Sequence, residues 1–153
     1  TTETLQRGAR ADLLFGGQAP QAFIDHAAWV TVNAYEAQLL QDRTGLSTRD
    51  LAARVKAYVV TRGPEGSLIH ADGRTIEVPA VRAAQVVDPT GCGDAYRAGM
   101  LYGLIRGIDW ETTGRIASLM GSIKIASVGT QHHKLAPGEF KERFHAAFQY
   151  RLD

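Results

Sequence analysis

The stretch Val86-Val87-Asp88-Pro89-Thr90-Gly91-Cys92-Gly93-Asp94 decides the fold, because a β-type run breaks into a turn of small residues that opens directly into a helix. Gly91 and Gly93 let the backbone turn tightly and come close to a ligand. The first amides of the following helix point their unpaired N–H groups into the same space, where the helix carries about half a positive charge. The turn is therefore predicted to bind an anion such as phosphate.

Asp94 lies in this turn, and the residues alone allow two interpretations of its carboxylate. It can be the N-cap of the helix, a position that Asp favours and where it is typically worth about 1 kcal/mol. It can instead be a general base that takes a proton from a hydroxyl, while the adjacent amides hold the phosphoryl group that the hydroxyl attacks. Spacing does not separate the two.

Outward from this turn, patterns typical of strands and helices alternate along the chain. Buried strands are predicted at 29–32, 58–61 and 86–87, with an antiparallel hairpin over 67–78. Helices are predicted at 21–28, 34–43, 94–106, 110–127 and 137–148, with a short one that Ser47 or Thr48 caps. This alternation is typical of an α/β layered domain with a mostly parallel sheet, whose ligands bind beyond the carboxyl ends of the strands. Residues 1–28 are expected to form an irregular lead segment, and 29–153 the functional portion.

Composition narrows the function further. With 153 residues, 44% of them hydrophobic, the chain is long enough for one domain with a core. Its 17 basic and 16 acidic residues give a net charge of +1, which offers no basic surface for a nucleic acid. One cysteine excludes an internal disulfide, no apolar run reaches membrane-spanning length, and the first residues do not resemble a secretory signal. A small ligand, no membrane partner and a cytoplasmic location are expected.

Residues 88–99, Asp-Pro-Thr-Gly-Cys-Gly-Asp-Ala-Tyr-Arg-Ala-Gly, resemble the D-T-G-A-G-D signature of the PfkB (ribokinase-like) family of sugar and nucleoside kinases. The resemblance runs from about Trp29 to the end, and its local sequence is similar to that of bacterial adenosine kinase-like members. It implies a three-layer ribokinase-like domain, with a mostly parallel central sheet flanked by helices. It also implies that the amino-terminal half, with the sugar-binding glycines and a small β lid, is absent.

The resemblance assigns the catalytic residues. Asp94 is implied to be the base, and the backbone amides of Gly91, Cys92 and Gly93 to stabilise the charge that moves in the reaction. Cys92 stands where the family most often has alanine. A cysteine at a helix N-terminus can be a reactive thiol, but small size explains this residue adequately.

Asn33 and Glu36 form the pattern Asn-Ala-Tyr-Glu after the first strand. As structure alone, this pattern predicts a capping box at the start of a helix. It also resembles the family motif N-x-x-E, which implies that Glu36, with Asn33, places Mg²⁺ near the phosphates, usually through water.

The resemblance implies that nucleotide contacts come from two further regions. Thr61, Gly63 and Gly66 are similar to a strand-end segment that lies along the nucleotide, although alone they indicate only a glycine turn. Gly129, in a later loop, and Ser118, on the helix before it, are implied to border the adenine. A helical serine more often bonds its own backbone or faces solvent.

Cations and charged side chains around the turn complete the expected site. Asp88 and Thr90 are implied to bind a monovalent cation in some relatives, which makes K⁺ a further candidate. Arg97 and Lys124 could reach a phosphate, but a solvated helix face is the commoner place for such charges, so neither receives a role.

The predicted function is transfer of the γ-phosphoryl of Mg-ATP to a hydroxyl of an adenosine-like nucleoside or a sugar. The alternative is a nucleotide-binding remnant, or a regulatory or interaction module, without kinase turnover. The predicted partners are ATP and the acceptor. A further expectation is self-association or pairing with the missing amino-terminal half, since an apolar sheet edge would otherwise be uncovered.

Overall fold

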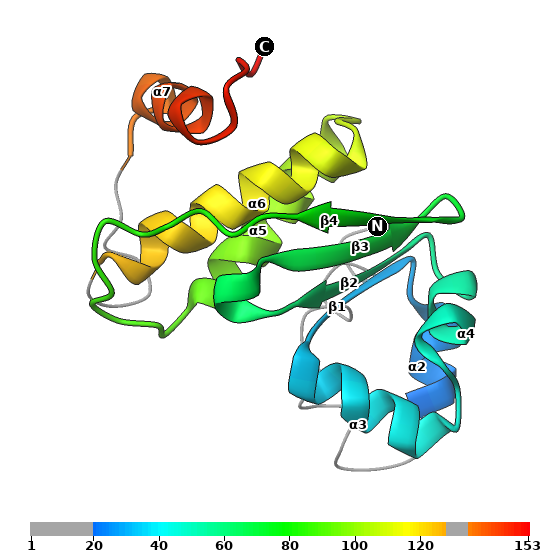
Figure 1. Cartoon of the computed structure of the whole chain (residues 1–153). Helices are drawn as coiled ribbons and strands as arrows, with labels where there is room; N and C mark the ends of the chain where they lie inside the picture. The colour runs from blue at the N-terminus through cyan, green and yellow to red at the C-terminus, as the bar shows by residue number, and fades with distance from the viewer. Residues whose placement is uncertain (1–19, 128–134) are drawn as a thin grey trace. The chain divides into compact units, whose positions relative to one another are not determined.

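A computed structural model describes residues 20–127 and 135–153 of the chain. The described residues form two compact units. The first comprises those up to Gly63 together with Ser67–Glu77, and the second comprises Pro64–Gly66 and those from Val78 to Asp153. Figure 1 draws the elements of both units.

The first unit contains a sheet in the order β1-β2-β3-β4, formed by β1 (Trp29–Asn33), β2 (Ala57–Thr61), β3 (Ser67–Ala71) and β4 (Arg74–Val78). β1 and β2 are parallel, whereas β2 and β3 are antiparallel. The predicted strands at 29–32 and 58–61 and the predicted hairpin are confirmed. Asp72 and Gly73 turn the hairpin with φ of 52° and 71°, the positive values that a tight two-residue hairpin turn requires.

Three helices, α2 (Pro20–His26), α3 (Ala34–Thr44) and α4 (Thr48–Ala53), pack on one face of β1 and β2. Alternate strand residues point to this face, and Val30 is the register partner of Tyr58. Fully burying such a side chain is worth about 1.5–3 kcal/mol. The buried residues of this cluster are Ile24, Val30, Val32, Ala37, Leu40, Leu51, Tyr58 and Val60. Because α2 contributes Ile24, part of the predicted lead segment belongs to the core of the first unit.

Local capping chemistry sets the ends of α3 and α4. Gly45 ends α3 in the left-handed conformation, with φ of 69°. The Ser47 hydroxyl accepts the Asp50 N–H at 3.1 Å, and the Ser47 N–H donates to the Asp50 carboxylate at 3.1 Å. This reciprocal capping box starts α4 at the predicted position.

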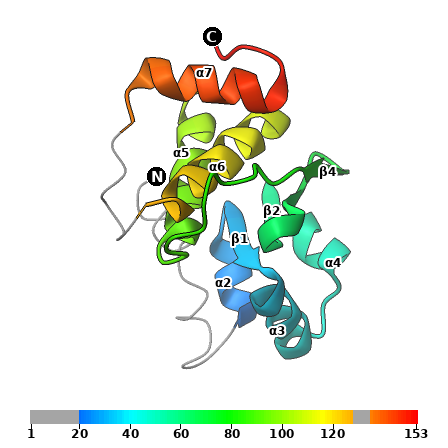
Figure 2. The same ribbon diagram turned by 60° about the vertical axis from the view of Figure 1, so that its left-hand side comes forward.

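The second unit contains α5 (Cys92–Ile105), α6 (Trp110–Ile125) and α7 (Pro137–Phe148). α5 and α6 lie side by side in both ribbon views (Figures 1 and 2). A Cβ on Gly99 would come within 2.5 Å of the Cα of Ala117, and a Cβ on Gly103 would overlap the Thr113 side chain. The close approach of the two helices therefore depends on glycine at both positions.

α7 begins at Pro137, as predicted, and packs on α6 through aromatic side chains. Phe144 is fully buried in a cluster with Ile116, Leu119 and Ile123. Its ring centroid lies 4.8 Å from that of Phe148 and 5.2 Å from that of Tyr150. No helix in 20–127 or 135–153 is both long enough and apolar enough to cross a membrane.

One predicted strand and one predicted helix start near the signature are wrong. Val86 and Val87 form no strand and are exposed, because the N–H groups of Val87 and Asp88 donate to the carbonyl oxygen of Ile125, at 2.8 and 3.1 Å. The helix that was expected from Asp94 begins two residues earlier, at Cys92.

Candidate active site

The signature turn is shaped by its own hydrogen bonds. The Thr90 N–H donates to the Asp88 carboxylate at 2.9 Å, and the Cys92 N–H donates to the Pro89 carbonyl at 3.2 Å. Gly91 is the N-cap of α5 in the left-handed conformation, with φ of 81°. Its side chain is a hydrogen atom, so no side chain caps α5, and amides of the first turn remain available to an anion.

Asp94 is not the N-cap of α5, so the capping interpretation is wrong. It is the third residue of α5, after Cys92 and Gly93, and its side chain is 81% exposed. The carboxylate lies 3.0 Å from the Arg97 guanidinium. A carboxylate in the first turn of a helix interacts favourably with the helix dipole, and the exposed Asp94 side chain lies in a first turn that no side chain caps.

Cys92 is half-buried in this turn, and its thiol lies 4.0 Å from the Asp88 carbonyl oxygen. Burial raises the pKa of the Cys92 thiol. The nearby Lys124 lowers it by less, and Asp88 raises it further. A raised pKa keeps the group as a thiol, which is a poor nucleophile. Cys92 thus contributes a backbone amide and a small side chain to the turn.

In the first unit, Asn33 and Glu36 form the predicted capping box. The Asn33 side-chain oxygen accepts the Glu36 N–H at 2.8 Å, and the Glu36 carboxylate accepts the Asn33 N–H at 2.9 Å. A carboxylate offers about four lone-pair sites, so this bond leaves capacity for water molecules of a hydrated cation. No group of three or more His, Cys, Asp and Glu side chains able to hold a metal occurs in the described ranges. The few side-chain oxygens of Asn33 and Glu36 suit Mg²⁺, which keeps several waters and takes few protein ligands.

Thr61 and Gly63 follow β2 in the first unit. The Thr61 hydroxyl donates to the Val32 carbonyl oxygen at 3.4 Å, and Gly63 opens a short 3-10 helix, η2 (Gly63–Glu65), with φ of 56°. Gly66 belongs to the second unit and has φ of 86°. A Cβ there would overlap the carbonyl oxygen of Val78, so a structural requirement explains Gly66 whether or not it contacts a nucleotide.

The Ser118 side chain forms its hydrogen bonds outside its own helix. Its hydroxyl donates to the Pro79 carbonyl oxygen at 2.9 Å and accepts the Val81 N–H at 3.3 Å. These bonds tie α6 to the segment that follows β4, and they explain the serine structurally. Its contact with adenine stays a prediction. Gly129 lies outside the described residues.

Lys124, to which the sequence assigned no role, is fully buried. Its ammonium donates to the carbonyl oxygens of Asp88, at 3.4 Å, and of Ser127, at 3.3 Å. Helical spacing from Thr113 and Ala117, both of which are buried, places Lys124 on the same face of α6. This spacing could have indicated that Lys124 is buried, but the prediction assumed that its helix face is solvated.

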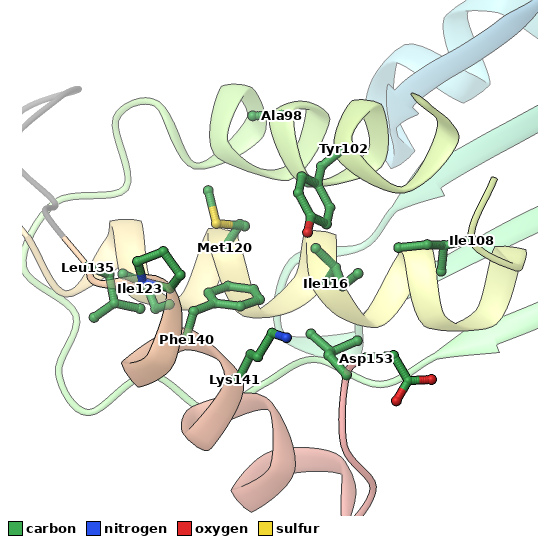
Figure 3. A pocket seen from close by; sticks show the side chains of 13 residues that line it. Ala98, Tyr102, Ile108, Ile116, Met120, Ile123, Leu135, Phe140, Lys141 and Asp153 are labelled. Atoms are coloured by element: carbon green, nitrogen blue, oxygen red, sulfur yellow. The ribbon is translucent and has the colours of Figure 1, made fainter. Parts of the chain in front are cut away.

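A largely apolar cavity of about 440 Å³ lies among α5, α6 and α7 (Figure 3). Met120 and Phe140 point into it, and Tyr102, Lys141 and Asp153 supply its polar atoms. None of the predicted site residues lines this cavity. The signature turn and the cavity are therefore different features of the second unit.

A glycine turn that leaves helix amides free, with a carboxylate in the first helical turn, is a feature of α/β proteins that transfer phosphoryl groups. The sequence pattern of the pfkB family of carbohydrate kinases matches residues 13–136. The chain belongs to this family.

Relatives of known structure share the fold. A Burkholderia thailandensis nucleoside kinase in complex with inosine is 48% identical, with a TM-score of 0.87 over 91% of this chain and 46% of that chain. The structure of the same enzyme in complex with ADP-inosine has the same identity and TM-score, over 44% of that chain. The ribokinase-like α/β fold class is thereby confirmed. Within the described residues, its parallel part is the β1–β2 pair.

Curated relatives agree with this family. A nucleoside kinase of Methanocaldococcus jannaschii is 35% identical over 108 residues, which are 71% of this chain and 36% of the relative. A ribokinase of Bacillus subtilis is 32% identical over 111 residues, 72% of this chain and 37% of the relative. The chain thus spans little more than a third of the length of these relatives.

Proposed function

We propose that the protein carrying this chain transfers the γ-phosphoryl of Mg-ATP to a hydroxyl of a nucleoside. The observation that carries the proposal is the exposed Asp94 carboxylate in the first turn of α5, whose N-terminal amides no side chain caps. Membership of the pfkB family gives this arrangement its chemical context. A nucleoside is favoured over a simple sugar because the 48% identical relative is a nucleoside kinase in complex with inosine.

Asp94 is the general base in this proposal. The acceptor oxygen forms a bond to the γ-phosphorus, the bond from that phosphorus to the leaving oxygen of ADP breaks, and the acceptor proton passes to the Asp94 carboxylate. The backbone amides of Gly91 and Gly93 stabilise the charge on the phosphoryl oxygens, together with the Cys92 amide, which would share its N–H between phosphate and the Pro89 carbonyl oxygen. A positioned base contributes about 10²- to 10⁴-fold to such a reaction.

Other residues have the remaining roles in this proposal. Glu36, oriented by its capping bond with Asn33, accepts hydrogen bonds from water around Mg²⁺, which when bound neutralises phosphate charge. The residues proposed to line the nucleotide are Thr61, Gly63, Gly66, Ser118 and Gly129. A cytoplasmic location and association with an amino-terminal half stay predictions, and K⁺ at Asp88 and Thr90 is not part of this proposal.

A fusion protein tests the proposal. It joins residues 20–153 to the amino-terminal half of the B. thailandensis nucleoside kinase, and the assay measures inosine-dependent release of ADP from Mg-ATP. We expect turnover by the fusion. The isolated chain is expected to bind ATP weakly and to phosphorylate neither inosine, adenosine nor ribose, because positioning of the acceptor accounts for several kcal/mol of barrier lowering.

The assays of the fusion protein and of the isolated chain also distinguish a kinase from the alternative function. If the fusion binds ATP as the relative does but releases no ADP with any acceptor, the chain is a nucleotide-binding module without turnover. Robust acceptor-dependent turnover by the isolated chain would contradict the proposed division of the active site.

A further inference from the structure

The buried ammonium of Lys124 is the least expected charge near the signature turn. Its exposed fraction is 0%, and its described partners are two carbonyl oxygens, those of Asp88 and Ser127. Burying an ammonium costs several kcal/mol unless hydrogen bonds and nearby negative charge offset it. A lysine that fills space alone would be replaced at lower cost by methionine or leucine, so the charge itself requires an explanation.

The position of Lys124 supplies the compensating negative charge. The residue lies in the last turn of α6, where unpaired carbonyl groups carry about half a negative charge. The Ile125 carbonyl accepts the N–H groups of Val87 and Asp88, and the Ser127 carbonyl accepts the ammonium itself. Two carbonyl oxygens beside a compact cation are part of the kind of oxygen shell that a dehydrated alkali cation takes.

The Asp88 carbonyl links this cation to the turn. The same residue donates its N–H to Ile125 at 3.1 Å and accepts the Thr90 N–H on its carboxylate at 2.9 Å. The Cys92 thiol lies 4.0 Å from the Asp88 carbonyl oxygen. Asp88 is thus held on its amide, its carbonyl and its side chain, and the chain continues from it into Gly91 and the first turn of α5.

We propose that Lys124 is a positioning residue for the signature turn, and that its ammonium takes the place of a free monovalent cation at the Asp88 carbonyl. The chain then needs no K⁺ to hold this turn in shape. The catalytic role of this turn rests on the proposed function. The contact between Lys124 and Asp88 stands independently of it.

The experiment uses the full 153-residue chain as wild type, as Lys124→Met and as the control Lys141→Met, which removes an exposed ammonium from the same unit. Thermal unfolding and ATP affinity are measured in tetramethylammonium chloride, potassium chloride and ammonium chloride at equal ionic strength. Wild type and Lys141→Met are expected to give the same midpoint and the same Kd in all three salts. Lys124→Met is expected to bind ATP about tenfold more weakly in tetramethylammonium chloride and to recover with NH₄⁺ or K⁺.

Rescue by a small cation separates a cation role from simple packing, since a lost packing contact does not respond to NH₄⁺. A wild-type chain that K⁺ stabilises, or a Lys124→Met chain that binds ATP like wild type in every salt, would overturn the proposal. If Lys124→Met does not fold in any salt, Lys124→Gln, which keeps a neutral donor, replaces it under the same criteria. If no form binds ATP, the proposed function fails, and the salt dependence of unfolding still decides the role of Lys124.

Discussion

The Asp94 carboxylate lies 3.0 Å from the Arg97 guanidinium, three residues further along α5, while 81% of the Asp94 side chain stays exposed. Exposed ion pairs of this kind are worth about 0–1 kcal/mol. Arg97 therefore does not immobilise the carboxylate, and Asp94 remains free to approach a hydroxyl.

Arg97→Met is expected to change acceptor-dependent turnover of the fusion protein by no more than about threefold, because a weak exposed pair is lost and the base remains. Steady-state kinetics with inosine measure this effect. A loss comparable to removal of the base would show that Arg97 contacts the substrate or the phosphates.

Glu36→Gln is expected to raise the Mg²⁺ concentration that gives half-maximal turnover, with little change in thermal stability. Glutamine still completes a capping box, so the helix start is preserved while the negative charge is lost. The matched control is Asp50→Asn in the second capping box, which should leave the Mg²⁺ titration unchanged. An unchanged titration for Glu36→Gln would leave Glu36 with the capping role alone.

Cys92→Ala is expected to be nearly silent in the fusion protein. The raised pKa of the thiol argues against a nucleophile, and alanine keeps the backbone amide that the proposal uses. Turnover and modification by a thiol reagent are measured in parallel. A large loss of turnover in the alanine variant would restore a chemical role for the thiol.

The stability of the first unit is expected to fall at acidic pH because of His70. Its ring stacks on Tyr58 at 6.1 Å between centroids and hydrogen-bonds the Thr75 hydroxyl at 2.9 Å. Burial lowers the pKa of His70 below its usual 6.5, so the folded state binds this proton less readily than the unfolded state. The contribution of this group to stability is therefore complete above pH 6.5 and is lost as the pH falls through the folded pKa.

Urea unfolding of the chain between pH 7.5 and pH 5 measures this dependence. Stability should decline toward pH 5 in the wild type and decline less in His70→Phe, which cannot take up a proton. Equal declines in the two chains would assign the acid sensitivity to other groups.

The features that sequence predicted well are those set by neighbouring residues. The capping box at Asn33, the helix cap at Ser47, the Asp72-Gly73 hairpin turn and the start of α7 at Pro137 each depend on chemistry within about four residues. Turn and cap residues act through their own backbone, so their positions can be inferred without knowledge of the fold.

The features that sequence missed depend on distant partners. Val87 donates to Ile125 instead of to a strand, Lys124 bonds Asp88 across 36 positions, and Ser118 bonds Pro79 across 39. A β-branched residue most often lies in a strand, and a charged side chain most often lies in solvent. Tertiary contacts determine where a particular residue actually lies.

The central claim is that Asp94 is the base of a kinase, and Asp94→Asn in the fusion protein tests it most directly. Asparagine removes the charge at nearly constant size, and because Asp94 is not the N-cap, the start of α5 should be preserved. The measurement is single-turnover phosphorylation of inosine, with ATP affinity determined on the same samples. The account predicts a rate lower by about 10²- to 10⁴-fold with nearly unchanged ATP affinity. A rate near that of the parent fusion would contradict it.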